Sequence, residues 1–183
     1  MVGHKLREDW NKRAAVDDDG DSWTYSGGGG AWAEDDDEKR TKEWIGITSS
    51  SDGTKLAAVV NDGNIWTSTD SGGNWISVGS SKKWISITSS SDGTKLAAVV
   101  NDGNIWTSTD SGATWTEDTS VGSTKDWRSI TSSSDGTKLA AVEYGGNIWT
   151  FEAPSPPSTS AWTLVGDDVD GSTDDYLGYS VSM

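Results

Sequence analysis

The sequence predicts an all-β chain built from tandem four-stranded antiparallel sheets. Three observations carry this prediction: a repeat of 40 residues, three turn signals inside each copy, and short runs rich in Ile, Val, Trp and Thr between the turns. The segments 47–72 and 87–112 are the same 26 residues, ITSSSDGTKLAAVVNDGNIWTSTDSG. A third copy begins at Trp127 as WRSITSSSDGTKLAAVEYGGNIWT, after a three-residue insertion in the preceding connection.

The turn signals define the strands of each copy. In the first copy they are DG at 52–53, DG at 62–63 and DSG at 70–72. Asp-Gly between such runs is typical of a hairpin with a type I′ turn, in which both central residues have positive φ. Three successive hairpins make a four-stranded meander. The strands are expected near 44–49, 54–60, 64–69 and 75–78.

Pairing about these turns places apolar side chains on both faces of each sheet. Ile45 is predicted to oppose Val60, which in turn opposes Ile65, while Val59 and Trp66 lie on the other face. A sheet that is apolar on both faces must be covered on both sides. A run of like sheets, each covering the next, is a propeller or a solenoid stack, and a four-strand period of about 40 residues matches a propeller blade.

The copies predict about three and a half blades of a β-propeller-type array. A degenerate half-copy, SWTYSGGGGAW from Ser22 to Trp32, lines up with IWTSTDSGGNW but has lost the aspartate. Because propellers typically have four to eight blades, we expect a partial or open array that is part of a larger protein. The alternative is a small closed ring in which residues 176–182 join the strands at Trp23 and Trp32.

The expected organisation has six parts. A charged N-terminal lead covers 1–20, a degenerate half-blade with an acidic connector covers 21–38, three blades cover 44–83, 84–126 and 127–166, and an acidic tail with one strand covers 167–183. In the lead, Leu6, Trp10 and Ala14 have helical spacing over about one and a half turns. In the third blade, an irregular Pro/Ser loop at 153–160 replaces the DSG turn.

Two octapeptides of the repeat share one motif. STDSGGNW, from 68 to 75, recurs as STDSGATW, from 108 to 115, and both fit S-x-D-x-G-x-x-W. The motif occurs at the same position in two copies of the repeat. In this the chain resembles the BNR/Asp-box repeat proteins, whose relatives include sialidases, sortilin-type receptors and photosystem assembly factors. The resemblance covers roughly residues 22–162 and implies a β-propeller.

The motif residues are predicted to be structural. They are Ser68, Asp70, Gly72, Trp75, Ser108, Asp110, Gly112 and Trp115. An aspartate at a turn accepts hydrogen bonds from backbone N–H groups, a glycine adopts the positive φ that follows, and a tryptophan covers the hairpin. The resemblance implies the same role, since in that family the box joins the third and fourth strands of a blade, away from the catalytic face.

Composition argues against several classes of function. The formal net charge is −15 and the pI is near 4.2, which disfavours nucleic acid and anionic membranes as partners. No apolar run approaches the ~20 residues of a membrane span, and no secretory signal is visible. There is no cysteine, and hence no disulfide, thiol nucleophile or thiolate metal site. The compartment stays open, with the cell surface as one option if the chain is part of a larger protein.

The sequence favours a binding protein over an enzyme. A sialidase-like site needs three arginines to clamp a carboxylate, a tyrosine nucleophile with its glutamate partner, and an acid/base carboxylate. Of four arginines, Arg128 alone lies inside a repeat, and the single histidine, His4, lies in the lead. We expect a non-catalytic scaffold that binds protein or glycan and can self-associate. The alternative is a fragment of a glycosidase-related enzyme whose catalytic blades are absent from this chain.

Acidic clusters are the remaining candidates for chemistry. Asp168, Asp170 and Asp174 are spaced as ligands of Ca²⁺, a hard cation that takes six to eight oxygens, but the segment does not follow an EF-hand loop. The tail from 166 to 183 also resembles the opening of an FG-GAP repeat, in which such a loop can hold calcium. We favour solvated loop charge and no cofactor, with calcium as the alternative.

The third copy departs from the other two at Arg128 and Glu143. Around the turn at 135–136, hairpin pairing places Arg128 opposite Glu143, where the first copy pairs Ile45 with Val60. Burying both charges would cost several kcal/mol per ion, which their attraction often fails to recover. We therefore expect a cross-strand ion pair on a sheet face that stays partly exposed, at the open end of the array.

Overall fold

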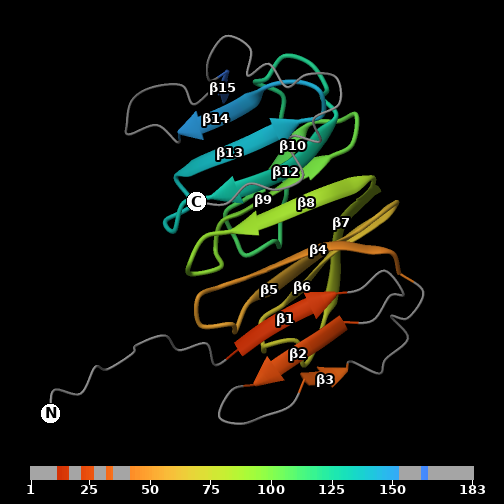
Figure 1. Ribbon diagram of the computed structural model, residues 1–183. Coiled ribbons are helices and arrows are strands. Elements are labelled where there is room, and N and C mark those ends of the chain that lie inside the picture. The colour runs from red at the N-terminus through yellow and green to blue at the C-terminus, as the bar shows by residue number, and fades with distance from the viewer. Residues whose placement is uncertain (1–11, 17–21, 27–31, 35–41, 153–161, 165–183) are drawn as a thin grey trace, which may run out of the picture.

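The computed structural model describes residues 12–16, 22–26, 32–34, 42–152 and 162–164 (Figure 1). Every regular element in these ranges is a β-strand. The strands are β1 (Lys12–Val16), β2 (Ser22–Ser26), β3 (Trp32–Glu34), β4 (Trp44–Ser49), β5 (Leu56–Val60), β6 (Gly63–Ser68), β7 (Ile76–Lys82), β8 (Trp84–Ser89), β9 (Leu96–Val100), β10 (Ile105–Ser108), β11 (Thr116–Asp118), β12 (Trp127–Ser132), β13 (Lys138–Glu143), β14 (Ile148–Glu152) and β15 (Trp162–Leu164). The all-β prediction is confirmed.

The strands pair in chain order within four sheets. One sheet has three described strands, β1-β2-β3, and three sheets have four strands each: β4-β5-β6-β7, β8-β9-β10-β11 and β12-β13-β14-β15. All strand pairs are antiparallel. Each 40-residue repeat therefore folds as one four-stranded meander, as predicted.

The sheets stack one after another, and their first strands touch in succession. β8 contacts both β4 and β12, and the second strand of one sheet contacts the first strand of the next, as β5 does with β8. Figure 1 shows the β1–β3 sheet and the β12–β15 sheet at opposite ends of the stack. The described sheets thus form an open, partial propeller. The alternative prediction, a small closed ring through residues 176–182, depends on residues that lie outside the described ranges.

The hydrophobic core lies in layers between successive sheets. The layer between the first two four-stranded sheets contains Ala57, Val59, Ile65, Trp84, Ile87, Leu96 and Ala98. The layer between the second and third contains Ala97, Val99, Ile105, Trp127, Ile130, Leu139 and Ala141. Neighbouring residues of β9 therefore enter different layers, since successive side chains of a strand point to opposite faces. The prediction of sheets that are apolar on both faces is confirmed.

The first hairpin of each repeat has the predicted register except at one β-bulge. Gly46 pairs with Val59, but Trp44 rather than Ile45 faces Val60. Ile45 is the extra residue of the bulge, and the same shift occurs in the other two four-stranded sheets. The bulge brings the first tryptophan of each repeat onto the face of Val60, where it is buried.

The second hairpin differs from the predicted register by one residue. Ile65 pairs with Val59 and not with Val60. A type I′ turn requires positive φ at both Asp62 and Gly63, but of these two residues Asp62 alone has it, at 50°. The hairpin is therefore centred on Asp62, and Ile65 joins Val59 in the layer that faces the next sheet.

The first sheet begins earlier than predicted. β1 lies in the segment expected to be a charged lead, and it pairs with β2 so that Ala15 faces Trp23. The sequence KRAAVDDDGDSW at 12–23 parallels KLAAVVNDGNIW at 55–66, a signal that the prediction missed. β1 holds the place of a repeat's second strand, so the boundary at residue 20 is wrong. Ala14 lies in a strand because sheet pairing overrides helical spacing this short.

Burial predicts which isoleucine the fold depends on. Ile105 is fully buried between two sheets, and Ile76 on β7 is 66% exposed. We expect Ile105→Ala to lower the free energy of unfolding by about 2–5 kcal/mol, because it leaves a cavity in a packed layer. Ile76→Ala should change it by less than about 0.5 kcal/mol. Urea unfolding followed by tryptophan fluorescence measures both, and equal losses would contradict the layered core.

Candidate functional site

Each Asp-box motif forms a closed hydrogen-bonded loop between the third and fourth strands of its sheet. The Ser68 hydroxyl donates to Asp70 Oδ1 (2.8 Å) and accepts the Gly72 N–H (2.9 Å). Asp70 also accepts the backbone N–H of Asn74 (2.8 Å) and its side-chain Nδ2–H (2.6 Å). In the second motif, Ser108, Asp110, Gly112 and Thr114 make the corresponding bonds.

The glycine and the tryptophan of the motifs make further contacts. Gly112 has a φ of 88°, and a Cβ there would lie 2.8 Å from Thr67 Cγ2 of the preceding sheet. Trp115 donates its Nε1–H to Gly112 O (3.0 Å), and Trp75 packs with its ring centroid 6.4 Å from that of Trp44. These contacts support the predicted structural role of the Asp-box residues.

Hydrogen bonds within the loops lower the pKa of both motif carboxyl groups. Bonds from the side chain and then the backbone of Asn74, followed by the Ser68 hydroxyl, lower the pKa of Asp70 to about 2. The side chain and backbone of Thr114 lower the pKa of Asp110 to about 2 in the same way. A catalytic acid needs a pKa near the operating pH, so these two carboxyl groups are suited to holding a turn.

A second set of aspartates closes the turn between the first and second strands of each sheet. Asp92 accepts the Ser90 hydroxyl (2.6 Å) and the Thr94 N–H (3.0 Å), and Asp52 and Asp135 are bonded in the same way. The Ser90 hydroxyl is the main cause that holds the pKa of Asp92 well below its usual range. The repeated S-x-D-G-T pattern was the signal for this network, which sequence reasoning treated as a simple hairpin turn.

The predicted Arg128–Glu143 pair is wrong. A bulge at Arg128 places Trp127 opposite Glu143. Arg128 Nη2 lies 3.1 Å from Asp126 Oδ2, and the guanidinium lies 4.5 Å from the ring centroid of Tyr144.

Glu143 has partners of its own and lies on a different face from the one predicted. It accepts the Asn147 N–H (3.0 Å) and lies 3.6 Å from Lys125 Nζ. It shares the face of Trp127, which packs in the layer toward the preceding sheet. This face is not the open end of the array. The prediction failed because it assumed an unbroken register.

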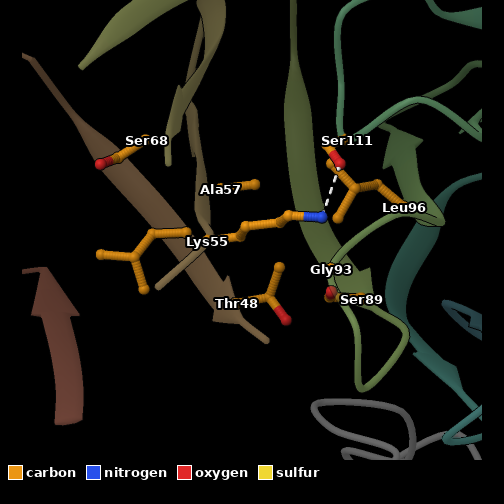
Figure 2. A pocket seen from close by; sticks show the side chains of 9 residues that line it. Thr48, Lys55, Ala57, Ser68, Ser89, Gly93, Leu96 and Ser111 are labelled. Atoms are coloured by element: carbon orange, nitrogen blue, oxygen red, sulfur yellow. Dashed lines mark hydrogen bonds between the residues drawn. The ribbon is translucent and has the colours of Figure 1, made fainter. Parts of the chain in front are cut away.

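A narrow cavity lies between the first two four-stranded sheets (Figure 2). Lys55 crosses it from one sheet, and its Nζ donates to Ser111 Oγ of the next (3.2 Å). Thr48, Ala57 and Leu96 line the cavity around the lysine. The remaining volume is about 10 Å³, near the least that holds one water molecule. Lys55 thus bridges the sheets, and the cavity has no room for a ligand.

A larger pocket opens between β7 and the sheet that follows it. Its volume is about 210 Å³. Its lining residues, which define the tryptophan pocket, are Gly79, Ser80, Trp84, Trp106, Ala113 and Trp115. Gly79 has a φ of 72°, and a Cβ there would lie 3.8 Å from Trp115 Cδ1, so the β7 backbone comes close to the indole. The pocket combines three indole rings of one sheet with the backbone of its neighbour.

The polar groups of the tryptophan pocket define what it could bind. Trp84 is 1% exposed, and its Nε1–H has no hydrogen-bond partner among the described residues. The equivalent Trp127 donates its Nε1–H to Gly103 O (3.1 Å). Lys82 Nζ lies 4.4 Å from the Trp106 ring centroid, a cation–π contact. The three indole rings of the pocket suit a ligand that has a flat apolar part.

Sequence reasoning did not identify the tryptophan pocket, although part of its signal was present. K-x-W recurs at 42–44, 82–84 and 125–127. In each sheet this lysine lies over the tryptophan of the third strand, with distances to the ring centroid of 4.7, 4.4 and 5.1 Å. The shared spacing predicts the lysine–indole contact, but the pocket also depends on how β7 runs past the next sheet.

Several predicted features lie outside the described residues. They are the calcium candidates Asp168, Asp170 and Asp174, the FG-GAP-like tail, the acidic connector at 35–38 and the Pro/Ser loop at 153–160. Within the described ranges, no group of three or more His, Cys, Asp or Glu side chains is placed to hold a metal ion. None of the elements in those ranges is a helix long and apolar enough to cross a membrane.

Four-stranded antiparallel sheets that stack in chain order through their first strands define a β-propeller-type protein. The solved structure of YCF48 bound to a D1 peptide has a TM-score of 0.62 with this chain at 18% identity, over 87% of this chain and 51% of that one. YCF48 from Cyanidioschyzon merolae has a TM-score of 0.60 at 18% identity, over 86% and 53%. The β-propeller domain of Myceliophteria thermophila Cps50 (Swd1) has 0.58 at 14%, over 85% and 55%.

This chain therefore has the fold of those propellers and spans about half of their length. Identities of 14–18% establish the fold and nothing finer. No protein-family model and no curated protein matches the sequence.

The lowered carboxyl pKa values predict acid sensitivity. A carboxyl group whose pKa falls from 3.8 to about 2 on folding stabilises the folded state above pH 3.8, and this contribution is lost as the pH falls toward 2. We expect Asp110→Asn to reduce the loss of unfolding free energy across that range. Asp62→Asn is the control, because Asp62 is outside the motifs and asparagine tolerates its positive φ. Urea unfolding at a series of pH values measures this, and equal pH profiles for wild type and Asp110→Asn would contradict it.

Proposed function

We propose that this chain is a non-catalytic β-propeller-type scaffold that binds a segment of another protein in the tryptophan pocket. The observation that carries the proposal is the 210 Å³ pocket in which Trp84, Trp106 and Trp115 of one sheet lie beside the β7 backbone of its neighbour. Tryptophan side chains bury large apolar areas and are enriched where proteins bind their partners.

The size of the pocket favours one anchoring side chain. Small-molecule sites usually have volumes of roughly 300–1,000 Å³, so the tryptophan pocket suits one ring or one side chain of a longer ligand. A flat apolar side chain stacks on the Trp106 and Trp115 indoles. The similar solved protein YCF48 is bound to a D1 peptide, which supports peptide binding on this fold.

Glycan binding is the second candidate, because sugar rings also stack on exposed indole faces. Ser80 in the same wall offers a hydroxyl to a sugar.

A glycosidase-related activity is the third and weakest candidate. The described Asp-box carboxyl groups have lowered pKa values and bond within their own loops. Membership of the BNR/Asp-box repeat proteins is part of the proposal and rests on the two complete motifs.

Blocking the tryptophan pocket should abolish binding without unfolding the protein. Ala113 is exposed and lines the pocket, so Ala113→Phe fills it, and Ala113→Ser is the matched control. We expect Ala113→Phe to weaken peptide binding by about tenfold or more, and Ala113→Ser to leave it unchanged. Labelled protein on a peptide library and on a glycan array, followed by titration of the best ligand, measures this.

The same experiment distinguishes the candidates. Saturable binding to glycans alone, lost in Ala113→Phe, would replace the peptide by a glycan. Hydrolysis of a fluorogenic sialoside above the buffer rate would overturn the non-catalytic assignment. Binding that is equal in both Ala113 variants would place the site elsewhere on the array.

A further inference from the structure

The lysine of each K-x-W segment lies over an indole ring, but its other neighbours differ between repeats. In the third repeat, Lys125 Nζ lies 5.1 Å from the Trp149 ring centroid and 3.6 Å from Glu143 Oε2. In the second repeat, Lys82 Nζ lies 4.4 Å from the Trp106 ring centroid. Among the described residues, no carboxylate lies within ion-pair distance of Lys82.

This difference follows from one position of the repeat. LAAVVNDGNIW of the second repeat aligns with LAAVEYGGNIW of the third, so Val100 stands where the third repeat has Glu143. Each of these residues faces the first tryptophan of its sheet: Val100 faces Trp84, and Glu143 faces Trp127. The third repeat therefore contains the carboxylate that the second repeat lacks.

Lys82 lies beside the tryptophan pocket. Trp106, over whose ring the lysine ammonium lies, forms part of the pocket wall, and Ser80 of the same wall is two residues earlier on β7. Trp84, which faces Val100, is also in the wall. A carboxylate group of a bound molecule can therefore reach Lys82 while the same molecule fills the pocket.

Glu117, on the neighbouring strand, does not take the place of the missing carboxylate. It pairs with Trp106 across β10 and β11, and its Oε1 accepts the Asn104 Nδ2–H (2.9 Å). Lys83 follows Lys82 directly and is exposed. Two positive charges thus lie at this end of β7, beside a pocket that is otherwise lined by indole rings, small side chains and backbone.

We propose that the protein segment bound in the tryptophan pocket has an acidic side chain next to its flat apolar one, and that this carboxylate pairs with Lys82. The proposal rests on the proposed binding of a protein segment in this pocket and names the chemistry of that segment. The flat side chain fills the pocket against Trp106 and Trp115. The carboxylate bonds the lysine as Glu143 does in the third repeat.

The surroundings of Lys82 favour this ion pair. The lysine is half-buried, and its ammonium lies over an indole ring. Charges that are partly removed from water attract one another more strongly than fully exposed ones. The lysine is already held beside the pocket by its cation–π contact, so less side-chain freedom is lost when the carboxylate binds.

Three capped peptides test the charge of the ligand. They are Ac-Gly-Glu-Phe-Glu-Gly-NH2, the same peptide with both Glu residues replaced by Gln, and the same peptide with both replaced by Lys; the blocked ends remove the terminal charges. We expect the glutamate peptide to bind the 183-residue protein about fivefold more tightly than the glutamine peptide. The lysine peptide should bind more weakly than either. Isothermal titration calorimetry measures the three dissociation constants.

Variants of the lysine and of the position opposite Trp84 test where the carboxylate binds. Lys82→Gln should bind the glutamate and glutamine peptides equally, and Lys82→Arg should keep the preference because it keeps the positive charge. Lys83→Gln, at the exposed neighbouring lysine, is the matched control and should also keep it. Val100→Glu should remove the preference because it gives Lys82 an internal partner, as in the third repeat, whereas Val100→Gln should not. Circular dichroism checks that each variant is folded.

The outcomes separate this proposal from the function on which it rests. Equal binding of the glutamate and glutamine peptides, with both blocked by Ala113→Phe, would overturn the acidic ligand and leave the pocket as a protein-binding site. Tightest binding of the lysine peptide would overturn it too, as would a preference for glutamate that persists in Lys82→Gln. Binding of none of the peptides, or binding that Ala113→Phe leaves unchanged, would overturn both the ligand and the pocket.

Discussion

Trp84 and Trp127, each at the start of a first strand, are buried between consecutive sheets, with 1% and 0% of their surface exposed. The bulge that follows each tryptophan aligns it with the second strand, on the face that packs against the preceding sheet. A single sheet that is apolar on both faces cannot bury itself, so its stability depends on its neighbours. The stacking order, the contacts between first strands and the position of the tryptophan pocket all depend on this burial.

The polar turns keep that packing in one arrangement. The carboxylates of Asp92 and Asp135 each bond a serine and a threonine within one turn, which fixes the connection from the first to the second strand. Lys55 also helps to lower the pKa of Asp92 across the gap between sheets, and Lys95 does so for Asp135. Because each lysine belongs to the preceding sheet, the same groups that close a turn also hold neighbouring sheets in register.

Much of this fold could be predicted from the sequence, because an identical 26-residue repeat must fold in the same way each time. The turn signals gave the strands, and the apolar runs gave sheets covered on both faces. The predicted strand register was wrong at the two places where the backbone conformation determines it. Because Asp62 has a positive φ and Gly63 does not, the second hairpin of the first repeat is shifted by one residue. The bulge at Arg128 separates that arginine from Glu143. Neither effect has a marker in side-chain polarity.

The segments 47–72 and 87–112 are identical, so chemical differences between their two blades must arise outside these segments, above all in the connections. The connection at 76–83 is three residues shorter than that at 116–126. Where it is short, β7 runs on to Lys82, and its backbone at Gly79 forms one wall of the tryptophan pocket. Where it is long, β11 ends at Asp118 and Val121 packs against the core instead. The short connection therefore supplies one wall of the tryptophan pocket, and Trp84, Trp106 and Trp115 supply the other.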